Sequence, residues 1–228
     1  MRTMKKIALV IAATMLLAMY ACNPKTNESH SMQAKVDAFV EVELTADISH
    51  LSENEKKMLP LLFEAAQIMD DIFWTQAYGN KQEFLSKIED DATLAFAKLN
   101  YGPWERLKDN KPFIEGYGEK PLGANFYPTD MTREEFESFN SDDKSSLYTI
   151  IRRNADGSLV SIPYSIAYKE QHEKAAELLR KAAELAEDDG LKNYLNLRAE
   201  ALLTDEYLAS DMAWMDMKTN NIDFVVGP

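Results

Sequence analysis

Apolar residues recur every three or four positions over residues 53–76, which is the spacing of one buried helix face. The series comprises Met58, Leu61, Leu62, Ala65, Met69, Ile72 and Phe73. Ser52 and Glu55 precede it in the S-x-x-E arrangement of a capping box, so we expect the folded part to begin near Leu51. Pro60 lies inside the pattern and predicts either a kinked helix or a helix that starts near Met58.

Two more helices are predicted toward the C-terminal end of the chain. Residues 166–187 place one set of apolar residues on a single face: Ala175, Leu178, Leu179, Ala182, Leu185 and Ala186. Gly190 follows as the expected C-terminal stop of this helix, and residues 191–203 form the next one. Because the turn between them is short, the two helices should pack as an antiparallel pair.

Shorter helices are expected in two other places. Residues 81–100 form either one helix or two, with an interruption near Glu89 and the two aspartates that follow it. Residues 133–139 form a single short helix, because Thr132 and Glu135 repeat the capping-box pattern.

The period of the pattern changes to two in residues 147–163. Asp156-Gly157 lies between two runs of apolar and β-branched residues, and this arrangement predicts a β-hairpin. Residues 222–226 are also apolar and β-branched, and they predict a C-terminal strand. The fold class is therefore mainly α with a small β component (α+β): a helical lobe with a hairpin at about 147–163 and a strand at about 222–226.

Residues 101–130 form an exception to these periodic patterns, and we call them the aromatic loop. They contain four of the eight glycines and four of the eight prolines, which exclude a regular helix or a central strand. They also contain six aromatic residues: Tyr101, Trp104, Phe113, Tyr117, Phe126 and Tyr127. A disordered linker rarely carries so many aromatic residues. We therefore expect an ordered loop that either fills the core between helices or lines a substrate groove.

Charge and composition narrow the classes of function. The 228 residues carry a formal net charge of −13, which argues against nucleic-acid binding because phosphate contacts need clustered Lys and Arg. Only three histidines and one cysteine are present, which limits metal and nucleophile chemistry. His172-Glu173 begins like a zinc-binding helix motif, but Ala176 and Glu177 stand where the second histidine would be. We expect no metal site and no catalytic residues in this chain.

The N-terminus has the pattern of a bacterial lipoprotein signal. Basic residues precede an apolar run that is too short to span a bilayer, and the run ends just before Cys22. We expect residues 1–21 to be a signal peptide, Cys22 to carry the lipid and residues 22–48 to be a polar tether. A conventional or uncleaved signal peptide is the alternative. The lipid anchor would place the protein in the cell envelope, on the periplasmic side or at the cell surface.

Two groups of residues are candidates for ligand binding. In the aromatic loop, flat aromatic faces lie beside hydrogen-bonding groups at Tyr101, Trp104, Tyr117, Asn125 and Tyr127. Near the C-terminal end, Trp214 accompanies three carboxylates, Asp211, Asp216 and Asp223. Carboxylates beside an aromatic face could hold a cation such as a peptide amino terminus, whereas the alternative is a surface turn with Trp214 packed inward.

Six segments resemble the N-terminal part of the dipeptidyl peptidase III family, in its bacterial (Bacteroidetes-type) lipoprotein branch of zinc-dependent hydrolases. They are LSENEKKMLPLLFEAAQIMDDIFW, NYGPWERL, NKPFIEG, GANFYPTDMTREEF, RAEALLTDEY and DMAWMDMKTNNIDFVVGP. The resemblance spans roughly residues 51–228. It implies a zinc held by His-Glu-x-x-x-His and Glu-Glu-x-x-Ala-Asp motifs, and neither motif occurs in this sequence. It also matches Asp223 to an acidic residue that helps to bind the substrate amino terminus, although Val225 stands where the family commonly has Tyr.

The resemblance implies that residues 49–228 are the N-terminal lobe of a peptidase-like protein whose C-terminal catalytic part is absent. The expected function is to line the substrate cleft of a lipid-anchored zinc exopeptidase that removes dipeptides from peptide N-termini, inactive alone. The expected partners are a peptide substrate, the membrane and the remainder of the peptidase chain, and zinc is expected only with that remainder. The alternative is a complete lipid-anchored protein that binds peptides or glycans without catalysis.

Overall fold

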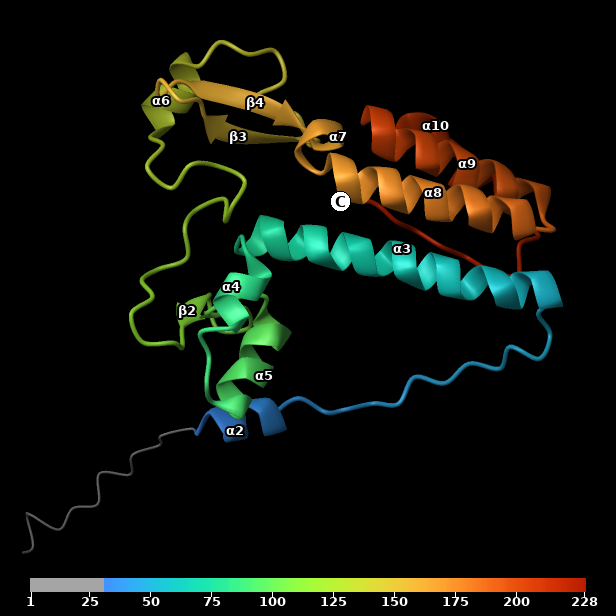
Figure 1. Ribbon diagram of the computed structural model, residues 1–228, viewed down its shortest axis with the longest axis horizontal. Helices are drawn as coiled ribbons and strands as arrows, with labels where there is room; N and C mark the ends of the chain where they lie inside the picture. The colour runs from blue at the N-terminus through green and yellow to red at the C-terminus, as the bar shows by residue number, and fades with distance from the viewer. Residues whose placement is uncertain (1–30) are drawn as a thin grey trace, which may run out of the picture. The chain divides into compact units, whose positions relative to one another are not determined.

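A computed structural model describes residues 31–228 (Figure 1), and the chain divides into two compact units, residues 1–41 and 42–228. The described part of the first unit contains helix α2 (Met32–Asp37), which is capped by the Ser31 side chain and buries none of its residues. The predicted signal peptide and the predicted lipidation site at Cys22 lie outside the described residues. No helix within residues 31–228 has the length and apolar character needed to cross a membrane.

The second unit is organised around helix α3 (Glu53–Ala77), which confirms the helix predicted from the first periodic pattern. Its N-terminus is closed by a complete capping box. The Ser52 hydroxyl accepts from the Glu55 amide at 3.1 Å, and the Glu55 carboxylate accepts from the Ser52 amide at 2.8 Å. Pro60 lies within the helix, so the helix does not start near Met58. The capping box therefore determines where the helix begins.

Four helices follow in the C-terminal half: α7 (Tyr164–Ala167), α8 (Lys169–Leu185), α9 (Asp189–Thr204) and α10 (Leu208–Asp216). Helix α8 packs against both α3 and α9, and α10 packs against α9. The pair of α8 and α9 confirms the prediction, but Gly190 is not the helix stop. Helix α8 ends earlier, and Gly190 lies in the first turn of α9 because Asp188 caps that helix through the Leu191 amide at 2.8 Å. Helix α10 was not predicted from the sequence.

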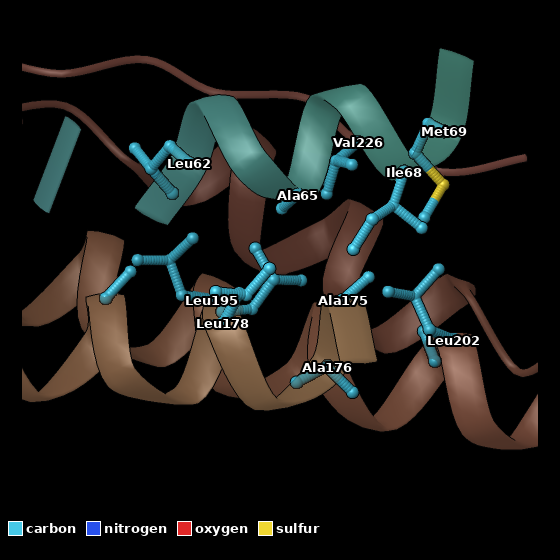
Figure 2. Close-up of a cluster of buried hydrophobic side chains, with 14 of the residues drawn as sticks. Leu62, Ala65, Ile68, Met69, Ala175, Ala176, Leu178, Leu195, Leu202 and Val226 are labelled. Atoms are coloured by element: carbon cyan, nitrogen blue, oxygen red, sulfur yellow. The ribbon is translucent and has the colours of Figure 1, made fainter. Parts of the chain in front are cut away.

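The helices enclose a core of aliphatic side chains (Figure 2). Its members from α3, α8 and α9 include Leu62, Ala65, Ile68, Ala175, Ala176, Leu178, Leu195 and Leu202. Leu62, Ala65, Ala175 and Leu178 lie on the faces that the sequence pattern predicted. Ile68 and Ala176 are buried although the pattern did not include them, whereas Phe73, which it included, is 38% exposed. Small alanines on α8 face larger residues on α3 and α9, which lets the helices approach closely.

The C-terminal segment differs from its prediction, because residues 222–226 do not form a strand. The alternation in the sequence is genuine: Ile222 and Val226 are buried and Phe224 is half-buried, whereas Asp223 and Val225 are exposed. The buried face packs on the helical core instead of on a neighbouring strand, and Val226 lies beside α3 (Figure 2). A period of two identifies the buried side of an extended segment, but it does not say whether the partner is a sheet or a helix layer.

The predicted hairpin is confirmed. Strands β3 (Thr149–Arg153) and β4 (Leu159–Pro163) pair antiparallel, with Arg153 opposite Leu159 at the turn. Gly157 adopts a φ of 86°, which is the left-handed conformation that the turn requires. The Ile151 amide donates to the Phe126 carbonyl at 2.9 Å, so the end of the aromatic loop is attached to this hairpin.

Helices α4 (Lys81–Leu85) and α5 (Asp91–Asn100) confirm the interrupted form of the predicted 81–100 helix. The aromatic loop then follows, with a two-residue antiparallel ladder between β1 (Trp104–Glu105) and β2 (Lys111–Pro112) as its regular structure. Helix α6 (Arg133–Ser138) comes directly after the loop. The described part of the chain is therefore mostly helical with two small two-stranded antiparallel sheets, as the fold class predicts.

Candidate functional site

The first part of the aromatic loop is a core plug. The Trp104 side chain lies among aromatic rings at the end of α3 and is only 9% exposed. Its indole N–H donates to the Gly118 carbonyl at 2.9 Å, and its ring lies 5.9 Å from the Tyr78 ring and 6.4 Å from the Tyr117 ring. Trp104, which the sequence indicated as a ligand-binding residue, thus presents neither a free face nor a free donor to a ligand.

Two tyrosines of the loop are held in the same cluster. The Tyr101 hydroxyl donates to the Asp70 carboxylate at 2.6 Å, and Tyr117 makes a hydroxyl–hydroxyl contact with Tyr78 at 3.2 Å. Burial and the Tyr117 hydroxyl raise the pKa of Tyr78 above its usual range. The Asp70 carboxylate likewise raises the pKa of Tyr101, so the phenols of Tyr78 and Tyr101 stay neutral and serve as hydrogen-bonding groups within the plug.

Asn125 attaches the loop to the end of α3. Its side-chain amide donates to the Thr75 carbonyl at 2.7 Å, and its backbone amide donates to the Gln76 carbonyl at 3.0 Å. Its own carbonyl accepts from the Arg152 guanidinium at 2.9 Å. Asn125 also lines a polar cavity of about 640 Å³, but its principal contacts are those of a structural anchor between α3 and the hairpin.

The second part of the loop lines an apolar cavity of about 530 Å³, which we call the Tyr127 cavity. It is lined by Pro121, Leu122, Gly123, Tyr127, Pro128, Thr129, Met131, Thr132, Arg133 and Phe136. The Tyr127 and Phe136 rings meet edge to face at 6.0 Å, so two aromatic side chains form one wall. An apolar, partly aromatic cavity with a few polar groups is typical of a small-ligand or side-chain site.

The position of Gly123 makes this wall possible. Its φ is 75°, and a Cβ atom there would lie 2.5 Å from Cδ2 of Tyr127. Any residue other than glycine would therefore displace the Tyr127 ring and strain the backbone. Tyr127, one of the predicted ligand-binding residues, is the aromatic member of the loop group that lines a cavity.

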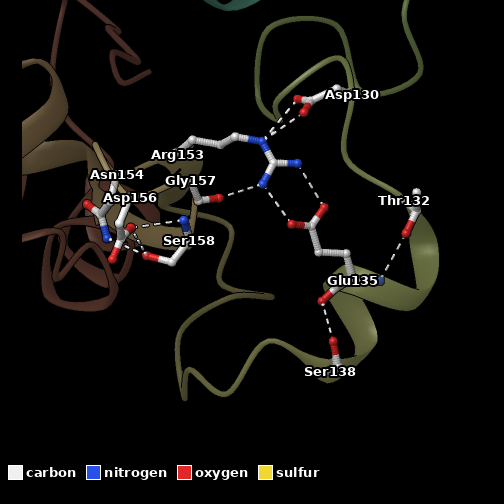
Figure 3. Close-up of polar contacts among 9 residues, drawn as sticks. All are labelled: Asp130, Thr132, Glu135, Ser138, Arg153, Asn154, Asp156, Gly157 and Ser158. Atoms are coloured by element: carbon white, nitrogen blue, oxygen red, sulfur yellow. Dashed lines mark hydrogen bonds and ion pairs between the residues drawn. The ribbon is translucent and has the colours of Figure 1, made fainter.

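An ionic clamp positions helix α6 beside this cavity (Figure 3). The Arg153 guanidinium contacts Glu135 of α6 at 2.7 and 2.9 Å and Asp130 of the loop at 2.9 and 3.1 Å. It also donates to the Gly157 carbonyl at 2.8 Å, so the hairpin, the loop and α6 meet at one side chain. At the other end of α6, the Lys144 ammonium donates to the Phe136 carbonyl at 2.8 Å. Both ends of the helix that carries Phe136 are thus fixed.

The electrostatics of the clamp follow from this geometry. Hydrogen bonds from Arg153 lower the pKa of both Asp130 and Glu135, which keeps the two carboxylates ionised near neutral pH. Glu135 does not complete the predicted capping box with Thr132. The Thr132 hydroxyl caps the Glu135 amide at 3.1 Å, but the Glu135 carboxylate binds Arg153 instead. The sequence pattern predicted the start of α6 correctly, but it did not predict that Glu135 binds Arg153.

The C-terminal candidates form a second site, the Trp214–Asp223 cavity, of about 360 Å³. The Trp214 indole N–H donates to Asp223 Oδ1 at 2.8 Å, so the fold brings these two predicted residues together. Trp214 is partly exposed, so it does not pack inward as the alternative required. Asp216, also predicted here, is exposed at the end of α10 and does not line this cavity.

Asp211 has a structural role nearby, together with a residue that sequence reasoning missed. Arg198 of α9 is buried, donates to the Asp211 carboxylate and lies over the rings of Tyr194 at 5.4 Å and Tyr207 at 5.2 Å. Arg198, Asp211 and Trp214 line a neighbouring cavity of about 270 Å³. A signal was present in the sequence, because Arg198 falls on the apolar face of the helix predicted over residues 191–203.

Metal ligands are not gathered in this part of the protein. Among residues 31–228, no group of three or more His, Cys, Asp or Glu side chains is arranged to hold a metal ion. His172 is fully buried, and Nδ1 donates to the Leu202 carbonyl at 2.6 Å. The described residues therefore do not fit a zinc ion.

The chain is similar to solved structures over most of its length. A DPP III from Caldithrix abyssi is 44% identical with a TM-score of 0.81, and the match covers 86% of this chain and 39% of that one. The chain is homologous to part of dipeptidyl peptidase III. A dipeptidyl-peptidase III from Corallococcus sp. strain EGB is 37% identical with a TM-score of 0.75, and that match covers 82% of this chain and 37% of that one.

A plant protein matches the same part of the chain. The Arabidopsis thaliana protein named Nudix hydrolase 3 is 29% identical over an alignment of 262 positions, and the match covers 88% of this chain and 34% of that protein. No family model matches the chain. The chain thus spans between 34% and 39% of the length of these relatives.

Proposed function

We propose that residues 49–228 form the N-terminal, substrate-cleft lobe of a zinc-dependent exopeptidase that releases dipeptides from peptide N-termini. The observation that carries this proposal is the match to the Caldithrix abyssi enzyme, at 44% identity and a TM-score of 0.81. In this proposal the zinc ligands and the catalytic residues belong to a part of the enzyme outside residues 1–228. The lobe contributes binding surfaces and is inactive alone.

Asp223 is the residue we assign to the substrate amino terminus. Its Oδ1 atom is oriented by the Trp214 indole at 2.8 Å, and no donor within residues 31–228 contacts Oδ2. A carboxylate with one oxygen fixed and the other open to solvent can accept a charge-assisted hydrogen bond from an ammonium group. The neighbouring Trp214 ring offers an aromatic face to the first side chain of the peptide.

A chimeric enzyme tests this proposal. Residues 1–228 are joined to the part of the Caldithrix abyssi enzyme that follows the matched region, and dipeptide release from a synthetic tetrapeptide is measured with and without zinc. We expect zinc-dependent release by the chimera and none by the 1–228 chain alone. A chimera that folds and binds zinc but releases no dipeptide contradicts the proposal.

Single substitutions in the chimera test the role of Asp223. Asp223→Asn keeps the shape of the side chain and removes its charge, so we expect KM to rise about tenfold or more with a smaller change in kcat. Asp216→Asn is the matched control, because Asp216 is an exposed aspartate at the end of α10, outside the cavity. Equal effects of the two substitutions would show that general charge, not the cavity, is responsible.

We also propose that the lobe is attached to a membrane in the cell envelope through a lipid on Cys22. The support is the sequence pattern of basic residues, apolar run and cysteine at the N-terminus. Cells that express the chain are labelled with a radioactive fatty acid, and the chain should carry the label. Cys22→Ser should abolish labelling and move the protein to the soluble fraction, whereas labelling that persists in this variant contradicts the assignment.

A second candidate function is favoured by the Tyr127 cavity, whose lining residues all lie within 121–136 of this chain. The chain would then bind peptides or glycans by itself, without metal. Isothermal titration of the 1–228 chain with aromatic tetrapeptides and with oligosaccharides tests it. Tyr127→Ala should abolish binding of the ligand, whereas Leu107→Ala, an exposed change outside the cavity, should not.

A further inference from the structure

Residues 42–48 have the sequence pattern of a half-buried β-strand. Apolar Val42, Leu44, Ala46 and Ile48 alternate with polar Glu43, Thr45 and Asp47 over all seven positions. Strict alternation over four to eight residues is the signature of a strand with one face against a core. Residues 42–48 therefore differ from the polar tether that the composition of residues 22–48 predicts.

The structure leaves this pattern without a partner. The apolar side chains face solvent: Val42 is 66% exposed, Leu44 is 93% exposed and Ile48 is 43% exposed. Within the described part of the chain, the backbone groups of residues 42–46 make no hydrogen bond to another residue. An exposed extended segment with one apolar face and unpaired amides is a template for strand addition.

We propose that residues 42–48 add as a strand to the edge of a β-sheet that belongs to the part of a dipeptidyl peptidase III-like enzyme outside residues 1–228. This inference rests on the proposed function. The Caldithrix abyssi enzyme extends well beyond the matched region, since the match covers only 39% of that chain. The segment has the length of an average strand. The apolar face of the segment would enter the core of the enzyme part outside residues 1–228. Its polar face would remain in solvent.

Pairing with a second copy of this chain is disfavoured by charge. An antiparallel pair centred on Thr45 places Glu43 of each copy opposite Asp47 of the other, and a parallel in-register pair places Glu43 opposite Glu43. Like charges directly opposite each other in a ladder are destabilising. A sheet edge of another chain segment, with Lys, Arg or neutral residues opposite Glu43 and Asp47, avoids this repulsion.

Pairing with the outer edge of β3 within this chain is also disfavoured. The Ile151 amide already donates to the Phe126 carbonyl at 2.9 Å, and the Ile151 carbonyl accepts from the Arg152 guanidinium at 2.8 Å. The aromatic loop and Arg152 therefore cover this edge at its centre. A new strand would have to displace both contacts.

Hydrogen–deuterium exchange tests the inference on two proteins, the 1–228 chain and the chimera with the Caldithrix abyssi remainder. Amides of residues 43–48 should exchange at unprotected rates in the 1–228 chain. In the chimera every second amide of the segment, on the side that faces the sheet edge, should slow on the order of 100-fold or more, as expected for a strand paired along one side. If the covalent chimera does not fold, the remainder is added in trans as a separate polypeptide, and protection of the same amides is measured in the mixture.

Two lysine substitutions test which face of the proposed strand is buried. Leu44→Lys places a charge on the apolar face and should abolish the protection in the chimera or in the mixture. Thr45→Lys places it on the polar face and should leave protection within about threefold, since surface changes cost little. In the 1–228 chain alone, both variants should keep the parental Tm because the segment is unpaired there.

The possible results are distinct. Protection of residues 43–48 in the 1–228 chain alone overturns the inference in favour of the β3–β4 hairpin, or in favour of a second copy if the protection grows with concentration. Absence of protection in both the chimera and the mixture also overturns it. A chimera that releases dipeptides with an unprotected segment rejects the strand and retains the proposed function. A chimera that binds zinc and protects the segment but releases no dipeptide supports the strand and rejects the proposed function.

Discussion

In the core of α3, α8 and α9, most contacts join aliphatic side chains that recur at helical spacing, whereas the aromatic loop is held by individually placed groups. Leu195 and Ala176 belong to the core and contact other apolar side chains, and these contacts need apolar neighbours but no particular polar atom. Asn125 in the loop depends on two carbonyls at the end of α3 and on Arg152. The helical core therefore tolerates exchange of similar apolar residues, but the loop depends on particular atoms at particular positions.

The largest expected effect is the loss of stability when a buried residue of the helical core is truncated, compared with truncation of an exposed residue of the loop. Leu195→Ala removes a fully buried side chain from the helical core and should reduce the free energy of unfolding by about 2–5 kcal/mol. Leu122→Ala removes a side chain that is 97% exposed in the loop and should change it by no more than about 0.5 kcal/mol. Urea denaturation of the 1–228 chain, followed by circular dichroism, measures both. Similar losses in the two variants would contradict the division into core and loop.

The next effect concerns the Tyr127 cavity. Gly123→Ala should cost about 1–3 kcal/mol through backbone strain at positive φ and displacement of the Tyr127 ring. Gly116→Ala is the matched control, since Gly116 also has a positive φ, of 88°, but has no atom within 4 Å of the added Cβ. The additional loss in Gly123→Ala therefore measures the clash with Tyr127. Equal losses would mean that backbone strain alone accounts for both.

A smaller effect is expected in the plug. Trp104→Phe keeps an aromatic side chain but removes the N–H that donates to the Gly118 carbonyl, and it should cost about 0.5–1.5 kcal/mol from that hydrogen bond. Exchange of amides near Gly118 should increase more than exchange in α8. A uniform increase across both regions would show that the plug and the helices unfold as one unit.

The smallest expected effect is a difference in pH dependence. Burial lowers the pKa of His172 in the helical core, so stability should decline as pH falls below 6.5, where the unfolded chain takes up the proton more readily. Arg153 lowers the pKa of Asp130 and Glu135, so the clamp should weaken only as pH falls below about 4.5. When Tm from thermal melts is plotted against pH between 7.5 and 5, the parent should lose stability more steeply than His172→Asn. Equal slopes would show that His172 is not the titrating group.

The sequence predicted the regions that depend on periodicity. The faces of α3, α8 and α9 follow from apolar spacing, the start of α3 from Ser52 and Glu55, and the hairpin turn from Asp156-Gly157. In each case the determining residues are neighbours in the chain. The apolar face of an extended segment was also visible at residues 222–226, but the identity of its partner was not, because that depends on packing between distant segments.

The candidate site was predicted less completely for the same reason. Trp214 and Asp223 belong to one candidate group because they are close in sequence, and the fold brings these two side chains into contact. The burial of Trp104 is the core-filling alternative that the sequence left open for the aromatic loop. The joining of Arg153 to Glu135 was not predicted, because this contact connects the hairpin with α6. Arg198 shows the limit of sequence prediction most clearly. A charged residue on an apolar helix face indicates a buried charge that needs a partner, but only the fold identifies Asp211 as that partner.

The burial of Val226 against α3 has a consequence for the order of events during synthesis. Helix α3 ends at Ala77, but its main partner α8 begins at Lys169, and Val226 completes the contact surface later still. Part of the apolar face of α3 therefore stays exposed until the residues up to Val226 have left the ribosome. Contacts between such distant segments slow folding and expose nascent chains to aggregation. We expect newly made α3 to depend on a chaperone until the residues around Val226 have emerged.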